Sequence, residues 1–211
     1  MAQQPLSRAP SGKRRGRPGH DQQSVLTTAV EVFNKHGFEA TSMGVLADNL
    51  GISKSAIYHH VPSKGYLLRL ALDRALDGLE AILKEPGAAE GPADDRLEYV
   101  LRRTVDVMVQ ELPFVTLLLR VRGNTEIERD AMARRRAFNA HVTKLVKAAS
   151  SEGSMRSDID PAITGRLLFG TINSIVDWYR PGGSITAQKL ADQLITLTFQ
   201  GLRLPATAQA S

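Results

Sequence analysis

Apolar residues recur every three or four positions along most of the chain, which is the spacing of one face of an α-helix. In the first third of the chain this spacing predicts helices over residues 22–36, 42–50, 53–60 and 63–83. Gly37 suits the left-handed cap that ends a helix, Gly51 breaks the second helix, and Pro62 stops the third helix before Ser63 caps the fourth. Residues 84–93 hold two prolines and two glycines, so we expect a loop there.

The helical spacing continues through the rest of the chain. It predicts five further helices, over residues 94–111, 113–122, 126–151, 161–179 and 187–201, and no convincing strand. Aromatic residues make up only 5% of the chain, and Ala and Leu dominate the apolar set, a bias that favours packed helices over sheets. The expected fold class is therefore all-α, with about nine helices.

Residues 42–61 fit a helix-turn-helix, in which a first short helix packs on a second that enters the major groove of DNA. Ala47 is small enough for close helix approach, Gly51 permits the turn, and Ile57 and Val61 would anchor the second helix to the core. The outer face then carries side chains suited to phosphates and bases, namely Lys54, Ser55, Tyr58 and His59. On spacing alone, a plain α-hairpin fits equally well.

The residues around this segment resemble the TetR family of one-component repressors over positions 22–72. The matching stretches are AVEVF (29–33), GF (37–38), ATSM (40–43), LA (46–47), LGISK (50–54), IYHHV (57–61), K (64) and LL (67–68). The resemblance implies that Tyr58 and His59 contact phosphates or bases. It also implies that Thr41 and Ser42 hold a phosphate through backbone donors, and that Lys64 contacts another. Val61 replaces the family's usual Phe or Tyr, which should affect packing only.

The N-terminal arm, residues 1–20, is polar and basic and is predicted to be flexible. Arg15-Gly16-Arg17-Pro18 resembles an AT-hook core, whose arginines can lie in a narrow A·T-rich minor groove. A solubilising basic tail is the alternative. The predicted DNA-binding set is Arg15, Arg17, Thr41, Ser42, Ser53, Lys54, Ser55, Tyr58, His59 and Lys64.

Charge and composition narrow the functional classes. Residues 1–64 hold 8 Lys/Arg against 4 Asp/Glu, whereas the remainder holds 19 against 18, so the basic excess lies at the end expected to meet DNA. The chain has no cysteine, which excludes disulfides and thiolate metal sites. His59 and His60 are neighbours on a helix and point apart, so they do not form a metal-ligand pair. With no apolar run of membrane-spanning length and no signal peptide visible, we expect a cytoplasmic protein with no cofactor.

The C-terminal half is predicted to bind an effector and to form a homodimer through its last two long helices, as the TetR resemblance implies. The alternative is that their apolar residues only fill a monomer core. The expected division is a flexible basic arm (1–20), a helix-turn-helix domain (21–66), an effector-binding and dimerisation domain (67–204) and a loose tail (205–211). The candidate effector-binding residues are Met108, Phe114, Leu117, Leu118, Arg120, Asn173, Asp177 and Trp178.

The C-terminal stretches LFGTIN (168–173) and WYRPGG (178–183) are similar to a TetR branch that senses acyl-coenzyme A thioesters. The arm and YHHVP (58–62) are similar to repressors of phenylacetate catabolism, which makes phenylacetyl-CoA a candidate inducer. The run Arg134-Arg135-Arg136 is expected to be a solvated face, or else to meet a phosphorylated ligand. An effector-independent architectural DNA binder and an activator remain alternatives. No nucleophile elbow, phosphate loop or His-Glu metal motif supports an enzyme.

Overall fold

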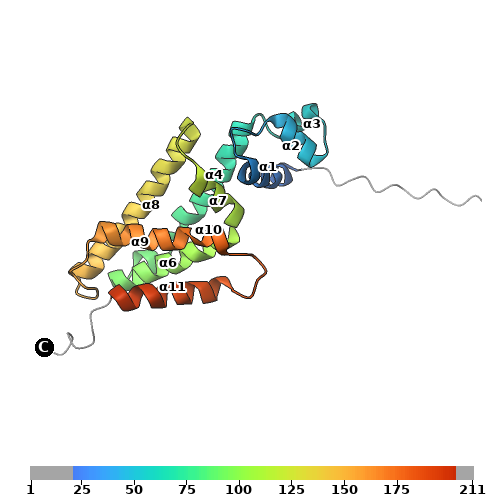
Figure 1. Ribbon diagram of the computed structural model, residues 1–211. Coiled ribbons are helices and arrows are strands. Elements are labelled where there is room, and N and C mark those ends of the chain that lie inside the picture. The colour runs from blue at the N-terminus through green and yellow to red at the C-terminus, as the bar shows by residue number, and fades with distance from the viewer. Residues whose placement is uncertain (1–20, 203–211) are drawn as a thin grey trace, which may run out of the picture.

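The computed structural model describes residues 21–202, and within them the chain folds as helices, which confirms the all-α class (Figure 1). The helices α1–α3 gather at one end of the molecule, and α4 leads from them into a larger bundle. The elements are α1 (Gln22–His36), α2 (Met43–Leu50), α3 (Lys54–His60), α4 (Lys64–Ile82), α5 (Pro86–Ala89), α6 (Ala93–Gln110), α7 (Leu112–Arg120), α8 (Glu126–Ser151), α9 (Pro161–Asn173), α10 (Ile175–Trp178) and α11 (Ala187–Leu202).

Side-chain caps set the start of each helix in the N-terminal unit. Asp21 caps α1, and serines cap α2, α3 and α4 by accepting a hydrogen bond from a backbone N–H in the first turn. Each such cap contributes about 1 kcal/mol to helix stability. Gly51 takes the left-handed conformation at φ 66°, which ends α2 and makes the tight turn into α3. The four predicted helices are therefore confirmed almost to the residue.

Two short helices differ from the prediction. Residues 84–93 were expected to form a loop, but Pro86–Ala89 makes one helical turn, because proline suits the first turn and Ala88 is buried. The helix expected over 161–179 is interrupted at Ser174, whose hydroxyl donates to the carbonyl of Thr171. A serine hydroxyl that bonds a nearby carbonyl competes with the helical ladder, so α10 follows as a separate turn.

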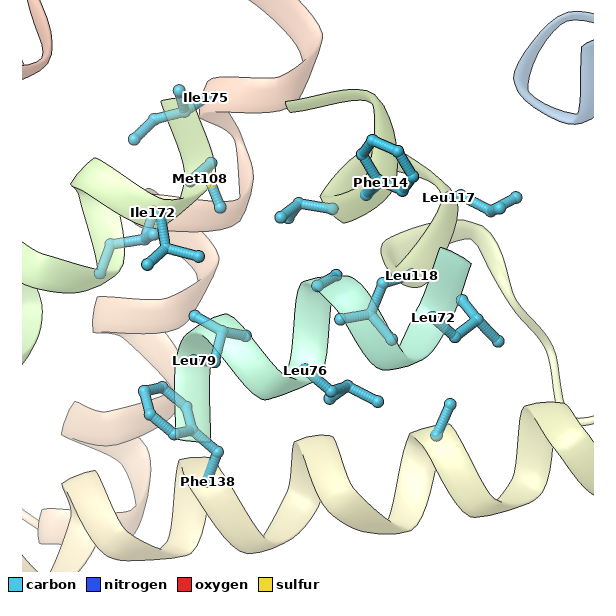
Figure 2. Close-up of a cluster of buried hydrophobic side chains, with 14 of the residues drawn as sticks. Leu72, Leu76, Leu79, Met108, Phe114, Leu117, Leu118, Phe138, Ile172 and Ile175 are labelled. Carbon is cyan, nitrogen blue, oxygen red and sulfur yellow. The ribbon is translucent and has the colours of Figure 1, made fainter. Parts of the chain in front are cut away.

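Helix α4 belongs to both parts of the molecule. It packs against α1 of the N-terminal unit and against α6, α7 and α8 of the large bundle. Leu72, Leu76 and Leu79 of α4 lie in the centre of the large core, facing side chains of α7 and α8 (Figure 2). A displacement of α4 in the large bundle therefore moves the N-terminal unit as well.

An arginine of α8 also fastens α4 to the large bundle. The Arg134 guanidinium donates to Asp73, Asp77 and Glu80, with N–O distances of 2.8, 2.5 and 2.8 Å. These hydrogen bonds hold the pKa of Glu80 below its ordinary value of 4.5 and raise the pKa of Arg134. The expectation that Arg134 lies on a merely solvated face is therefore wrong.

We predict that Arg134→Met lowers the free energy of unfolding at neutral pH by about 1–2 kcal/mol. All four side chains are about a third or more exposed, which limits the loss, but three carboxylates are left together on α4. A carboxyl group with a lowered folded pKa stabilises the protein above its unfolded pKa, and this is lost as the pH falls through the folded value. Urea unfolding should therefore show a smaller difference between wild type and variant at roughly pH 3. An equal difference at both pH values would contradict the charge argument.

Candidate nucleic-acid interface and effector cavity

Helix α3 presents a polar face to solvent. Ile57 is fully buried and Val61 is 1% exposed, so these two side chains anchor the helix as predicted. Tyr58 is 48% exposed although it is a large aromatic residue. Ser53, Lys54, Ser55 and His59 are exposed beside it. Ser53 is partly engaged, because its hydroxyl caps the helix and lies 3.0 Å from that of Ser55.

An open hollow of about 430 Å³ lies where α3 meets the N-terminal ends of α2 and α4. Five of the predicted DNA-binding residues line it, namely Thr41, Ser42, Lys54, Tyr58 and Lys64. Thr41 is only 2% exposed and its hydroxyl donates to the Gly37 carbonyl, so its side chain is not free for a ligand. The hollow combines two cationic side chains, a phenol and the start of α2, which suit an anion, with one carboxylate in the wall, that of Glu39.

Lys64 has a structural contact that the sequence did not reveal. Its ammonium donates to the backbone carbonyls of Phe38 and Glu39 and lies 4.4 Å from the centre of the Phe38 ring. The side chain thereby joins α4 to the loop between α1 and α2. An ammonium group has three donors, and the third is shared between solvent and the exposed Glu39 carboxylate, which lies 4.0 Å away and which a phosphate would have to displace.

The other predicted DNA-binding residues fall outside this hollow. Ser53, Ser55 and His59 lie along the exposed face of α3 without lining it. Arg15 and Arg17 of the basic arm lie outside the described residues.

The large bundle encloses a small internal cavity between α4, α6, α7, α8 and α9. Its volume is about 20 Å³, roughly the space of one water molecule. Most of its wall is apolar, and three polar side chains other than the Thr104 hydroxyl face it: Arg135, Asn139 and Asn173. An effector of any size must therefore displace part of the wall.

Three of the eight candidate effector residues line this cavity: Met108, Leu118 and Asn173. Phe114 and Leu117 are buried in the core without lining it (Figure 2). Leu117 and Arg120 instead border a separate hollow at the junction of α1 and α7, where Arg120 donates to the Asn34 carbonyl. Trp178 is 47% exposed in an outer hollow, and Asp177, also exposed, lines no wall of the cavity.

Several residues of the cavity wall were missing from the predicted set. They are Leu79, Thr104, Val115, Leu119, Arg135 and Phe169, whereas Phe138 and Asn139, which also line the cavity, lie among the apolar and polar positions that the sequence suggested for a pocket. Arg135 is half-buried, and its only hydrogen bond within residues 21–202 is to the Leu118 carbonyl. Burial lowers the pKa of Arg135, and the positive charge of Arg136 lowers it further. A cationic group held in an apolar wall without a carboxylate is a strong polar feature for a ligand to engage.

Helices α9 and α11 expose large apolar side chains. Ile163, Leu167 and Leu197 are 58%, 67% and 74% exposed. Such residues usually face a protein partner when they cluster on a surface. Across residues 21–202, no three metal-ligating side chains converge on a common point, and no helix is both long and apolar enough to cross a bilayer.

An exposed polar helix beside the hollow at the start of α2, joined through α4 to a larger helical bundle, is the arrangement of a helix-turn-helix DNA-binding regulator. The model for bacterial regulatory proteins of the tetR family matches residues 25–71, and the tetracyclin repressor-like C-terminal domain matches residues 90–202. The chain belongs to the TetR family of transcriptional regulators. Members of this family are DNA-binding regulators and not enzymes.

Individual relatives are similar to this protein in sequence or structure over most of the chain. The crystal structure of SCO3833 from Streptomyces coelicolor A3, a TetR regulator, is 51% identical, with a TM-score of 0.80 over 85% of this chain and 91% of that one. The transcriptional repressor KstR2 of Rhodococcus jostii is 27% identical over 86% of this chain and 90% of its own. AibR in complex with isovaleryl coenzyme A and operator DNA shares the fold, at 23% identity and a TM-score of 0.72 over 84% and 97% of the two chains.

Proposed function

We propose that this protein is a homodimeric repressor that binds an operator through α3 and is released from it by a small-molecule effector. The observation that carries the DNA-binding part is the hollow that gathers Ser42, Lys54, Tyr58 and Lys64 around the start of α2. Phosphate oxygens accept hydrogen bonds from all four types of side chain and from backbone N–H groups at a helix start. Ser55 and His59, further along the exposed face of α3, are then placed to reach bases or neighbouring phosphates.

We predict that Lys64→Met weakens binding to operator and to unrelated DNA by similar factors. A phosphate contact carries no sequence information, so the loss should be uniform. The slope of log affinity against log salt should become shallower by about one for each lysine removed. Methionine keeps an apolar stem against Phe38. Fluorescence anisotropy at several salt concentrations measures both quantities. A lower melting temperature with unchanged DNA affinity would instead limit Lys64 to joining α4 and the preceding loop.

The proposed release depends on α4. Leu79 of α4 lines the internal cavity, and the start of the same helix contacts α1 through Tyr66 and the loop before α2 through Lys64. Because the cavity has room for about one water molecule, an effector binds only where the walls, α4 among them, have moved. A ligand that prefers this displaced state draws the dimer toward it and away from operator-bound spacing.

We propose an acyl-coenzyme A thioester as the effector, with phenylacetyl-CoA as the first compound to test. The apolar wall, with Arg135 and the Asn139 and Asn173 amides, suits an acyl group joined to a polar thioester. AibR, which shares the fold, was crystallised with isovaleryl coenzyme A and operator DNA, so this fold is compatible with such a ligand.

The test is a gel shift with DNA from upstream of the protein's own gene. Phenylacetyl-CoA should lower operator affinity, with each preference of about 1.4 kcal/mol for the displaced state giving a tenfold loss. If no acyl-CoA in a set of chain lengths weakens the complex, the effector proposal fails. Tight, sequence-independent binding with no effector response would favour an architectural DNA binder instead.

A further inference from the structure

A further hollow, of about 380 Å³, lies on the outside of the bundle between α8 and α9. The two helices come close together there because Gly165 has no side chain. A Cβ atom at this position would lie 2.7 Å from the Thr143 hydroxyl oxygen. The result is an open groove with α8 on one side and α9 on the other, which we call the α8–α9 groove.

The groove and the internal cavity share part of their wall. Asn139 of α8 and Phe169 of α9 line both. Phe169 packs edge-to-face on Phe138, with ring centres 5.9 Å apart. The two spaces therefore adjoin at these two side chains.

Positive charge lines the groove and continues into the cavity. Arg136 and Arg166 flank the groove, and both are exposed. Neither has a hydrogen bond or ion pair within the part of the chain that the structure describes, whereas the adjacent Arg134 contacts three carboxylates. No acidic side chain lines either hollow.

Helix geometry explains how one stretch of α8 serves both spaces. Successive residues of a helix are turned by about 100°, so Arg135 reaches the inner cavity and Arg136 the outer groove. Asn139, one turn further along, lies near both arginines. Its side-chain amide has no hydrogen-bond partner among residues 21–202, so it is available to a ligand that passes between the two spaces.

We propose that the α8–α9 groove is a phosphate subsite continuous with the effector cavity. Arg136 and Arg166 hold the phosphate groups of an amphiphilic effector. Asn139 forms a hydrogen bond with the polar part of the effector that joins the phosphates to the acyl group, and the acyl group enters the cavity past Phe169. Arginine suits this task because its planar guanidinium gives two parallel hydrogen bonds to one phosphate. The inference rests on the proposed function, since it assigns the headgroup of the same effector.

The experiment compares three probes by calorimetry on the full-length protein. Phenylacetyl-CoA carries both parts, coenzyme A carries the phosphates without the acyl group, and S-phenylacetyl-pantetheine carries the acyl group without phosphates. The test variant is Arg136→Gln/Arg166→Gln. The control is Arg122→Gln/Arg129→Gln, which removes two exposed arginines that line neither hollow. Light scattering checks that each variant keeps the wild-type oligomeric state.

We expect the test variant to bind phenylacetyl-CoA and coenzyme A at least about tenfold more weakly, while its affinity for the phosphate-free thioester and the control variant's affinities stay unchanged. Equal affinity of wild type and test variant for the two phosphate-bearing probes overturns the subsite, as does an equal loss for all three probes. Failure of wild type to bind either phosphate-bearing probe also overturns it. If the arginine-dependent binding is found but operator release is not, the subsite stands and the proposed release fails.

Discussion

Replacing Tyr58 with alanine should abolish operator binding while leaving the protein folded. The side chain is 48% exposed, lines the hollow at the start of α2, and contributes nothing to the core that Ile57 and Val61 hold together. A hydrogen bond to a charged group contributes about 1.5–3 kcal/mol, and a dimer makes it twice. The loss of affinity should therefore exceed about 100-fold, whereas the melting temperature should change little.

Two further variants make this result specific. Tyr58→Phe removes only the hydroxyl, so it should lose most of the affinity if the phenol donates to phosphate, and little if the ring itself packs on DNA. His59→Ala, next on the same exposed face, should reduce affinity less, because His59 does not line the hollow. Anisotropy with labelled operator and thermal unfolding followed by circular dichroism measure both properties. Normal operator binding by Tyr58→Ala would show that α3 is not the recognition helix.

The DNA-binding half could be predicted from the sequence because its structure is fixed locally. The helix boundaries depend on contacts within three or four residues: Ser53 and Ser63 cap helices, and Gly51 ends one. Such local contacts can be predicted from the amino-acid sequence. Once that geometry is known, the start of α2 must lie beside α3, and five of the predicted residues meet in one hollow. The contact between Lys64 and Phe38 was not predicted, because the two residues are 26 positions apart and no local sequence pattern indicates it.

The internal cavity could be predicted only in part, because five helices distant in the sequence create it. Met108, Leu118 and Asn173 were found as apolar or amide positions near the middle of the bundle. Arg135 was missed because its neighbours in the sequence are charged, which suggested a solvated face, whereas the turn of the helix carries it inward. Trp178 follows the break at Ser174 and lies in an outer hollow, so its predicted contact with an effector stays a prediction.

Adding a charge to the exposed apolar face of α9 and α11 should separate the subunits and so remove operator binding. Leu167 and Leu197 are the most exposed large apolar residues of the described chain, at 67% and 74%. We propose that a second copy covers them. In that case Leu167→Glu/Leu197→Glu would bury four carboxylates in a dimer, each without a partner and at a cost of several kcal/mol. Light scattering should then report a monomer.

The loss of operator affinity follows because the dimer joins two copies of α3, one for each half-site. In a dimer, binding at one half-site places the second α3 at a high effective concentration near the other, which commonly raises affinity by about 100- to 10,000-fold. The double variant forfeits this gain although its helix-turn-helix is intact, so binding to one half-site should persist weakly. Ala133→Glu/Ala137→Glu, which adds the same charge at two exposed positions of α8, should remain dimeric and bind normally. A double variant that stays dimeric would exclude this face as the subunit interface, and a monomer with full affinity would mean that one subunit suffices for recognition.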